Sequence, residues 1–128
     1  MGLNGYRLSA SVAVSDMARA QAFYEGRLGL TPERTGGDGS RVYPSGGGAA
    51  LHVYPQPERA GESSATLATW YVDDVGQIVD ELGSRGVSFE HYEGIETDAR
   101  GISPRAGGGR VAWFKDPDGN TFAVEGER

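Results

Sequence analysis

Hydrophobic and polar positions follow one plan twice along this chain. Residues 9–14 alternate small and β-branched side chains, and an apolar series at helical spacing follows them. Residues 67–72 open the second copy, which continues into a second apolar series of the same spacing. Alternation is typical of a half-buried strand, whereas helical spacing is typical of an amphipathic helix. The pattern therefore predicts two strand–helix units, with junctions at Asp16 and Asp74 that lie about 58 residues apart.

The ends of both predicted helices have recognisable chemical signals. Asp16 precedes the first helix, and Asp73 or Asp74 precedes the second. A carboxylate at such a position accepts hydrogen bonds from the free N–H groups of the first turn and complements the helix dipole. Gly29 and Gly86 follow the last apolar positions of the two helices. Many helices end at a residue in the left-handed conformation, and glycine adopts this conformation most easily. Both helices are therefore expected to run from an aspartate to a glycine.

Three short strands are expected after each helix. They are predicted at 31–35, 41–43 and 49–54 in the first copy, and at 87–92, 110–115 and 121–125 in the second. Turn-forming residues occupy matching points, with Pro44-Ser45-Gly46 in the first copy and Asp116-Pro117-Asp118-Gly119-Asn120 in the second.

This order of elements predicts an α+β fold with two tandem βαβββ modules. Module one is expected over 6–55, a linker over 56–65, and module two over 66–126. Residues 93–109 interrupt module two with a glycine-rich segment that has no periodicity, either a functional lid or a tolerated surface insertion. Arg100 and Arg105 give this segment side chains that could reach a ligand.

Composition and charge narrow the class of protein. The net charge of −6 does not provide the basic face that nucleic acid requires, so no nucleic-acid partner is expected. The same acidity favours solubility and a cationic ligand. Cysteine is absent, which excludes disulfides and thiolate chemistry. No apolar stretch could span a membrane and no secretion signal is evident, so no membrane partner and a cytoplasmic location are expected.

Two sequence signatures within the doubled βαβββ plan resemble a known superfamily. They are Phe23-Tyr24 followed by Leu28-Gly29-Leu30, and the turn at 116–120. Together they are similar to the vicinal oxygen chelate superfamily, which includes glyoxalase I, extradiol dioxygenases, fosfomycin-resistance transferases and bleomycin-resistance proteins. The resemblance covers essentially the whole chain. It implies that the two modules form a curved, cup-shaped mixed sheet, with the helices on the outer face and the ligand inside.

The resemblance also implies where metal ligands would stand. Enzymes of that superfamily usually hold a divalent ion with His and Glu side chains from the first and last strands of each module. Carried over, the first-strand positions fall on Ser9 and Leu67, and the last-strand positions fall on Ala123 and near His52. A site of imidazole and carboxylate ligands needs three or more donors, and at most one remains. We therefore expect no metal and no cofactor, as in the metal-free, bleomycin-resistance-like branch.

Strand alternation indicates which side chains the cup would present to a ligand. In the two first strands, Val12, Val14, Trp70 and Val72 are expected to face the helices. One of Trp113 and Phe114 should line the interior, and aromatic walls with a few hydroxyl groups suit a small binding site. The expected ligand-binding residues are Ser9, Ser11, His52, Tyr54, Leu67, Thr69, Tyr71, Arg105, Trp113 and Ala123.

Three functions are compatible with such a site. The expected one is a metal-free protein that sequesters an aromatic natural product or antibiotic, as a resistance protein does. The second is a metal-independent isomerase, cyclase or lyase that uses His52 or Tyr71 as an acid or base. The third is a glyoxalase- or dioxygenase-like metalloenzyme with displaced ligands, drawn from His52, His91, Glu90 or Glu125. The resemblance further implies a homodimer.

Overall fold

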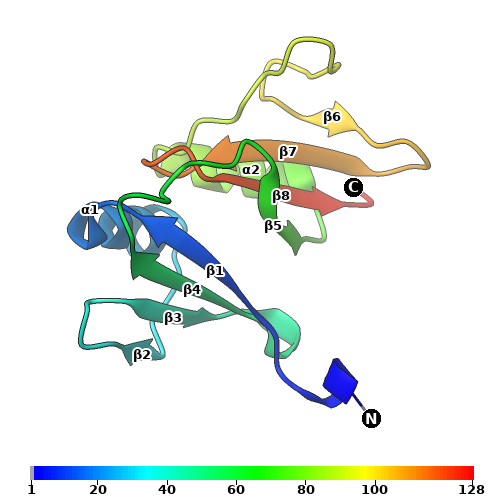
Figure 1. The fold of residues 1–128 in the computed structure, drawn as a ribbon. Helices are drawn as coiled ribbons and strands as arrows, with labels where there is room; N and C mark the ends of the chain where they lie inside the picture. Colours follow the sequence, from blue (N-terminus) through cyan, green and yellow to red (C-terminus); the bar gives the residue numbers. More distant parts are fainter. Residues whose placement is uncertain (1) are drawn as a thin grey trace. The chain divides into compact units, whose positions relative to one another are not determined.

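The computed structural model describes residues 2–128, and the chain divides into two compact units. The first unit, which contains module one, ends at Ala60, and the second, which contains module two, begins at Gly61. Each unit consists of a strand, a helix and three further strands in that order (Figure 1). The predicted α+β class and the two tandem βαβββ modules are therefore confirmed.

Module one is a four-stranded mixed sheet with one helical segment. Its elements are β1 (Ser9–Val14), α1 (Met17–Gln21), a π-helix (Ala22–Arg27), β2 (Arg34–Thr35), β3 (Arg41–Pro44) and β4 (Ala50–Pro55). The strand order is β1-β4-β3-β2, in which β1 is parallel to β4 and the other neighbours are antiparallel. Short 3-10 helices lie at Gly2–Gly5 and Gly46–Gly48.

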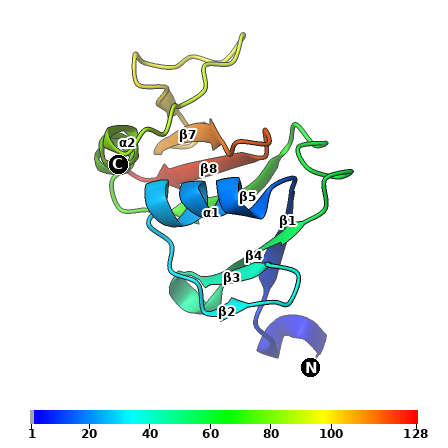
Figure 2. The same cartoon turned by 90° about the vertical axis from the view of Figure 1, so that its left-hand side faces the viewer.

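Module two repeats this topology. Its elements are β5 (Thr66–Tyr71), α2 (Val75–Ser84), β6 (Ser103–Pro104), β7 (Arg110–Lys115) and β8 (Thr121–Gly126). The order β5-β8-β7-β6 again places the first strand parallel to the last, with antiparallel pairs elsewhere. Figure 2 shows α2 alongside β7 and β8, the strands that it contacts. Within the described residues, no helix has the length and apolar character needed to cross a bilayer.

Each module has its core between its helix and one face of its sheet. In module one, Tyr24 of the π-helix stacks on Tyr43 of β3 with ring centroids 6.0 Å apart, and both rings are fully buried. In module two, Trp70 lies 6.2 Å from Phe114 and 5.6 Å from Phe122. Trp70 therefore belongs to the helix side of its sheet, as strand alternation predicts.

The predicted helix caps are confirmed in both modules. The carboxylates of Asp16 and Asp74 accept hydrogen bonds from the N–H groups of Arg19 and Gln77, at 3.2 and 3.1 Å. Of the two aspartates proposed for the second helix, Asp74 is thus the cap. Gly29 and Gly86 both have positive φ, at 76° and 93°, which is the conformation that ends a helix without steric cost only in glycine.

Module two places the first strand after its helix elsewhere than the sequence predicts. No strand forms over 87–92, where only an isolated bridge joins Phe89 to Phe114. The strand is β6, inside the segment that we expected to lack regular structure, and it pairs with β7. Ile102 and Ser103 are buried at this edge of the sheet, and the Asp98 carboxylate accepts the N–H of Ile102 in the turn that leads into β6.

Two further expectations for module one need correction. The strand predicted over 31–35 is confined to Arg34–Thr35. The single helix predicted up to Gly29 changes after Gln21 into a π-helix, in which the N–H of Leu28 donates to the carbonyl of Phe23, five residues earlier, at 3.0 Å. The wider turn still buries both Phe23 and Tyr24 against the sheet.

Candidate functional site

The sheet of module one has two chemically different faces. Val12 and Val14 of β1 are buried against the helix, whereas Ser9 and Ser11 point to the other side and are exposed. The alternation predicted for this strand is therefore confirmed. We call the side with the two serines the hollowed face, because it carries two hollows.

One transverse row of side chains crosses all four strands on the hollowed face. Ser11 of β1 is the partner of His52 on β4, His52 is the partner of Val42 on β3, and Val42 is the partner of Arg34 on β2. Directly paired residues project from the same side of a sheet. A hydroxyl, an imidazole, an isopropyl group and a guanidinium therefore stand side by side across the module.

His52 and Tyr54 form an aromatic platform on this face. They are two residues apart on β4, and their rings stack with centroids 5.4 Å apart and planes inclined by 20°. Both side chains are half-buried, which leaves part of each ring accessible. Such a pair offers a flat aromatic molecule a surface on which to stack, together with polar atoms that can fix its orientation.

The two hollows share the middle of the transverse row. The first has a volume of about 310 Å³ and is lined by Arg7, Ser9, Arg34, Val42, Ala50 and His52. The second has a volume of about 340 Å³ and is lined by Arg34, Thr35, Gly36, Ser40, Val42 and His52. Each lies at the lower end of the range for small-molecule sites, roughly 300–1,000 Å³.

Charged groups around the hollows are partly paired. Arg7 forms an exposed ion pair with Glu33, 3.2 Å between nitrogen and oxygen. Side-chain and backbone hydrogen bonds from Ser40 hold the pKa of the Asp38 carboxyl below its usual value, and the charge of His52 adds a small effect in the same direction. Within residues 2–128, the Arg34 guanidinium has neither an ion pair nor a side-chain hydrogen bond. Arg34 therefore remains available to a ligand.

Module two places its expected binding residues on the corresponding face of its own sheet. Thr69 of β5 pairs with Ala123 of β8, which pairs with Trp113 of β7. Trp113 also contacts Tyr92 edge to face at 5.7 Å, whereas Phe114 is fully buried on the helix side. Of the two alternatives at this position, Trp113 is therefore the one on the non-helical face.

Other expected residues of module two differ widely in exposure and pairing. Leu67 lies at an irregularity in the pairing of β5, and Tyr71 is 80% exposed. Arg105 is held by an ion pair with Glu125, 2.8 Å between the guanidinium Nε and a carboxylate oxygen. A ligand that used Arg105 would have to share it with Glu125.

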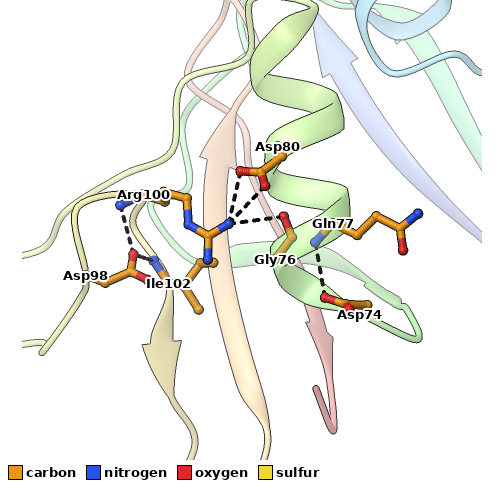
Figure 3. Close-up of polar contacts among 7 residues, drawn as sticks. All are labelled: Asp74, Gly76, Gln77, Asp80, Asp98, Arg100 and Ile102. Atoms are coloured by element: carbon orange, nitrogen blue, oxygen red, sulfur yellow. Dashed lines mark hydrogen bonds and ion pairs between the residues drawn. The ribbon is translucent and has the colours of Figure 1, made fainter.

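The long segment of module two is attached to α2 rather than extended toward a ligand. The Arg100 guanidinium donates to both carboxylate oxygens of Asp80, at 3.0 and 3.1 Å, and to the carbonyl of Gly76 at 3.5 Å (Figure 3). This hydrogen bonding to Asp80 raises the pKa of Arg100 above its usual value. A ligand that used Arg100 would have to compete with Asp80 for its guanidinium.

Asp98 shapes the same segment from within. Its carboxylate accepts hydrogen bonds from the N–H groups of Arg100 and Ile102, at 2.8 and 3.0 Å (Figure 3). The bond from Ile102 is the main cause that lowers the pKa of the Asp98 carboxyl. The resulting turn leads directly into β6, so this part of the segment is an ordered connection.

The residues at the superfamily's metal positions do not fit a divalent ion. Ser9 supplies only a neutral hydroxyl, while Leu67 and Ala123 supply no donor atom at all. Among the described residues, no group of three or more His, Cys, Asp or Glu side chains is placed to hold a metal. His52 alone cannot provide the set of imidazole and carboxylate donors that such an ion needs.

Sequence reasoning named some of the residues that share the hollowed face and did not name others. Ser9, Ser11, His52 and Tyr54 were expected, and the structure brings them together on the hollowed face. Arg7, Val42 and Arg34, which also line it, were not expected. Alternation continued backward from Ser9 would have indicated Arg7, but Arg34 depends on the pairing of β2 with β3.

The comparisons with known proteins agree on the fold family. The family model described as the glyoxalase/bleomycin resistance protein/dioxygenase superfamily matches residues 8–124. A search of curated proteins finds no match to this chain.

Solved structures share the fold over nearly the whole chain. A glyoxalase/bleomycin resistance protein from Catenulispora acidiphila is 29% identical with a TM-score of 0.68, covering 94% of this chain and 96% of its own. TnmS3, an antibiotic binding protein from Streptomyces sp. CB03234, is 26% identical with a TM-score of 0.70, covering 100% of this chain and 99% of its own. The fosfomycin resistance protein FosX from Listeria monocytogenes, at 13% identity and a TM-score of 0.71, covers 96% and 93% and shows the fold alone.

Proposed function

Because the chain belongs to the glyoxalase/bleomycin resistance protein/dioxygenase superfamily, we propose that it is a metal-free binding protein that sequesters an aromatic natural product or antibiotic. The observation that carries this proposal is the hollowed face of module one. There the stacked His52–Tyr54 pair adjoins two hollows and the Ser9 hydroxyl. The likeness to TnmS3, an antibiotic binding protein, supports the same class of ligand.

The chemistry at the superfamily's metal positions supports holding a ligand rather than reacting with it. Hydroxyl, isobutyl and methyl groups stand at Ser9, Leu67 and Ala123, where coordinating donors would be needed. Within module two, we propose Thr69 and Trp113 on its non-helical face as ligand-binding residues. Ser11, Tyr71 and Arg105 complete the set that we propose to contact ligand.

The test of this function is binding of an intact ligand. A panel of aromatic antibiotics is screened by thermal shift, since a molecule held only by the native state raises the unfolding midpoint. Hits are titrated by tryptophan fluorescence and then recovered and analysed by mass spectrometry. We expect stoichiometric binding and unchanged ligand. A panel in which no aromatic compound raises the midpoint or quenches the fluorescence contradicts the proposal.

Two matched histidine variants locate the site. His52→Ala removes half of the stacked pair, so affinity for a hit should fall by roughly tenfold, the equivalent of one aromatic contact. His91→Ala is the control, because His91 lies in module two and bonds to Thr97 at 2.9 Å. Equal losses in the two variants would place the ligand elsewhere.

The alternative is a metal-independent isomerase, cyclase or lyase on the same scaffold. The observation that favours it is the accessible imidazole of His52 beside Tyr54, since a neutral imidazole is a suitable base near neutral pH. Recovery of chemically altered ligand from the wild-type protein, but unaltered ligand from His52→Ala, would support this alternative over sequestration.

A further inference from the structure

We infer that the hollowed face of module one recognises the acidic group of an aromatic acid, with Arg34 as the residue that binds the anion. This inference rests on the proposed function and specifies the chemical class of its ligand. It departs from the expectation of a cationic ligand, which followed from the net charge of −6.

The charge of the hollows is opposite to that of the chain as a whole. Two arginines, Arg7 and Arg34, line them together with His52, and none of the residues that line them is an aspartate or glutamate. Interactions with exposed charges farther away than about 8 Å are largely screened at physiological ionic strength. Glu33 pairs with Arg7, and the Asp38 carboxylate accepts the N–H of Ser40 at 3.0 Å, so both nearby carboxylates already have partners and Arg34 is the cation left for a ligand bound in this place.

Arg34 is the cation of this face that has no internal partner. Arg7 is already neutralised by Glu33 at 3.2 Å. Arg41, on the same hairpin, belongs to the helix side, where it contacts Gln21 and Glu25 at 3.3 and 3.8 Å. Arg34 is exposed and lines both hollows, with its guanidinium unpaired within residues 2–128. A free guanidinium fork matches the two oxygens of a carboxylate.

The transverse row sets the distance between the anion and the aromatic platform. Arg34 and His52 are separated by one strand, which carries Val42 between them. Neighbouring strands are about 4.8 Å apart, so the two backbones lie about 10 Å apart. A ring system that lies over Val42 can therefore reach the guanidinium with its acidic substituent and the His52–Tyr54 stack with its far edge.

The test compares two probes of nearly the same shape, the anionic 2-naphthoate and the neutral 2-naphthamide, by isothermal titration. The wild-type protein should bind the naphthoate about tenfold or more tightly, and this preference should shrink as salt rises. Arg34→Gln should remove the preference, because it should weaken naphthoate binding far more than naphthamide binding. Arg110→Gln is the matched control, an exposed arginine on β7 that shares its side of the strand with buried Ala112 and Phe114.

Each outcome decides the inference. Equal affinity of the wild type for both probes, or no binding of either, overturns it, and so does a preference that persists in Arg34→Gln. None of these results overturns the proposed function, which depends on whether any compound of the antibiotic panel binds. Arg34→Lys controls for misfolding, because it keeps the positive charge but loses the two-pronged guanidinium. Its preference for naphthoate over naphthamide should lie between those of the wild type and Arg34→Gln.

Discussion

At the scale of single residues, the helix side of module one is organised around a buried phenol. Tyr43 is 1% exposed, stacks on Tyr24 and donates a hydrogen bond from its hydroxyl to Glu25 at 3.0 Å. Burial is the main cause that raises the pKa of Tyr43 above its usual value, and the carboxylate of Glu25 adds to the effect. The neutral phenol is thus the form that the folded state stabilises.

Replacing Tyr43 by Phe tests this contact. Tyr43→Phe should lower the free energy of unfolding by about 1 kcal/mol at neutral pH, because Glu25 loses its donor. The raised pKa of Tyr43 means that its contribution is present below the unfolded value, about 10, and is lost as pH rises from there. Urea unfolding at pH 7 and in the alkaline range checks both effects, and the variant should lose less stability than the wild type between them.

Tyr6→Phe provides the comparison for this measurement. Tyr6 is 76% exposed, so its substitution should change the free energy of unfolding by less than about 0.5 kcal/mol. A similar loss in both variants would mean that the bond to Glu25 contributes nothing to stability.

At the scale of elements, the segment that leads into β6 is held by contacts at several points. Arg100 joins it to α2, Asp98 closes its turn, and Gly101 lets the backbone pass close to Phe89 and Glu90. Gly101 is buried with φ of 87°, and a Cβ there would lie 2.9 Å from the Cβ of Phe89 and 3.2 Å from the carbonyl of Glu90. Only glycine meets both requirements.

Two glycine variants separate backbone strain from steric conflict. Gly101→Ala should destabilise the protein by more than about 2 kcal/mol, because strain at positive φ adds to the clash. Gly107→Ala has the same φ of 87° but open space around it, so it should cost only about 1 kcal/mol. Thermal unfolding gives the two values, and hydrogen exchange at Ser103 reports whether β6 detaches from β7. Equal losses would contradict the proposed close approach.

At the scale of the whole molecule, the small number of metal-ligating side chains that lie close together predicts that stability does not depend on a bound metal. The described residues contain no group of three or more ligating side chains, so chelation should leave the unfolding midpoint unchanged. Elemental analysis of protein purified without chelator should find less than stoichiometric transition metal. A stoichiometric metal whose removal lowers the midpoint would support the displaced-ligand alternative and contradict the proposed function.

The homodimer implied by the superfamily resemblance is also a prediction at this scale. Light scattering on the purified protein at micromolar concentration should give twice the mass of one chain. Dilution should then lower this mass only when the concentration approaches the dissociation constant, as mass action requires. A monomer at micromolar concentration would contradict the prediction.

The sequence by itself determined the features that depend on neighbours along the chain. The sequence predicted the cap at Asp16, a second cap at Asp73 or Asp74, the helix-ending glycines, the inward and outward sides of β1 and the turn at 116–120. In that turn, the Asp116 carboxylate accepts the N–H groups of Asp118 and Asn120 at 2.9 and 2.8 Å. These contacts span two to four residues, so local composition is enough to specify them.

Only the tertiary structure decided which distant residues meet. The position of β6, the ion pair of Arg100 with Asp80 and the place of Arg34 at the end of the transverse row all depend on strand register or on contacts between separate elements. The register of each strand is set by the burial of one of its faces against a helix. A short stretch of sequence does not include both the strand and the residues that it packs against. The sequence could therefore identify the stacked pair of His52 and Tyr54, whereas the place of Arg34 on the same face appeared only once the strands were paired.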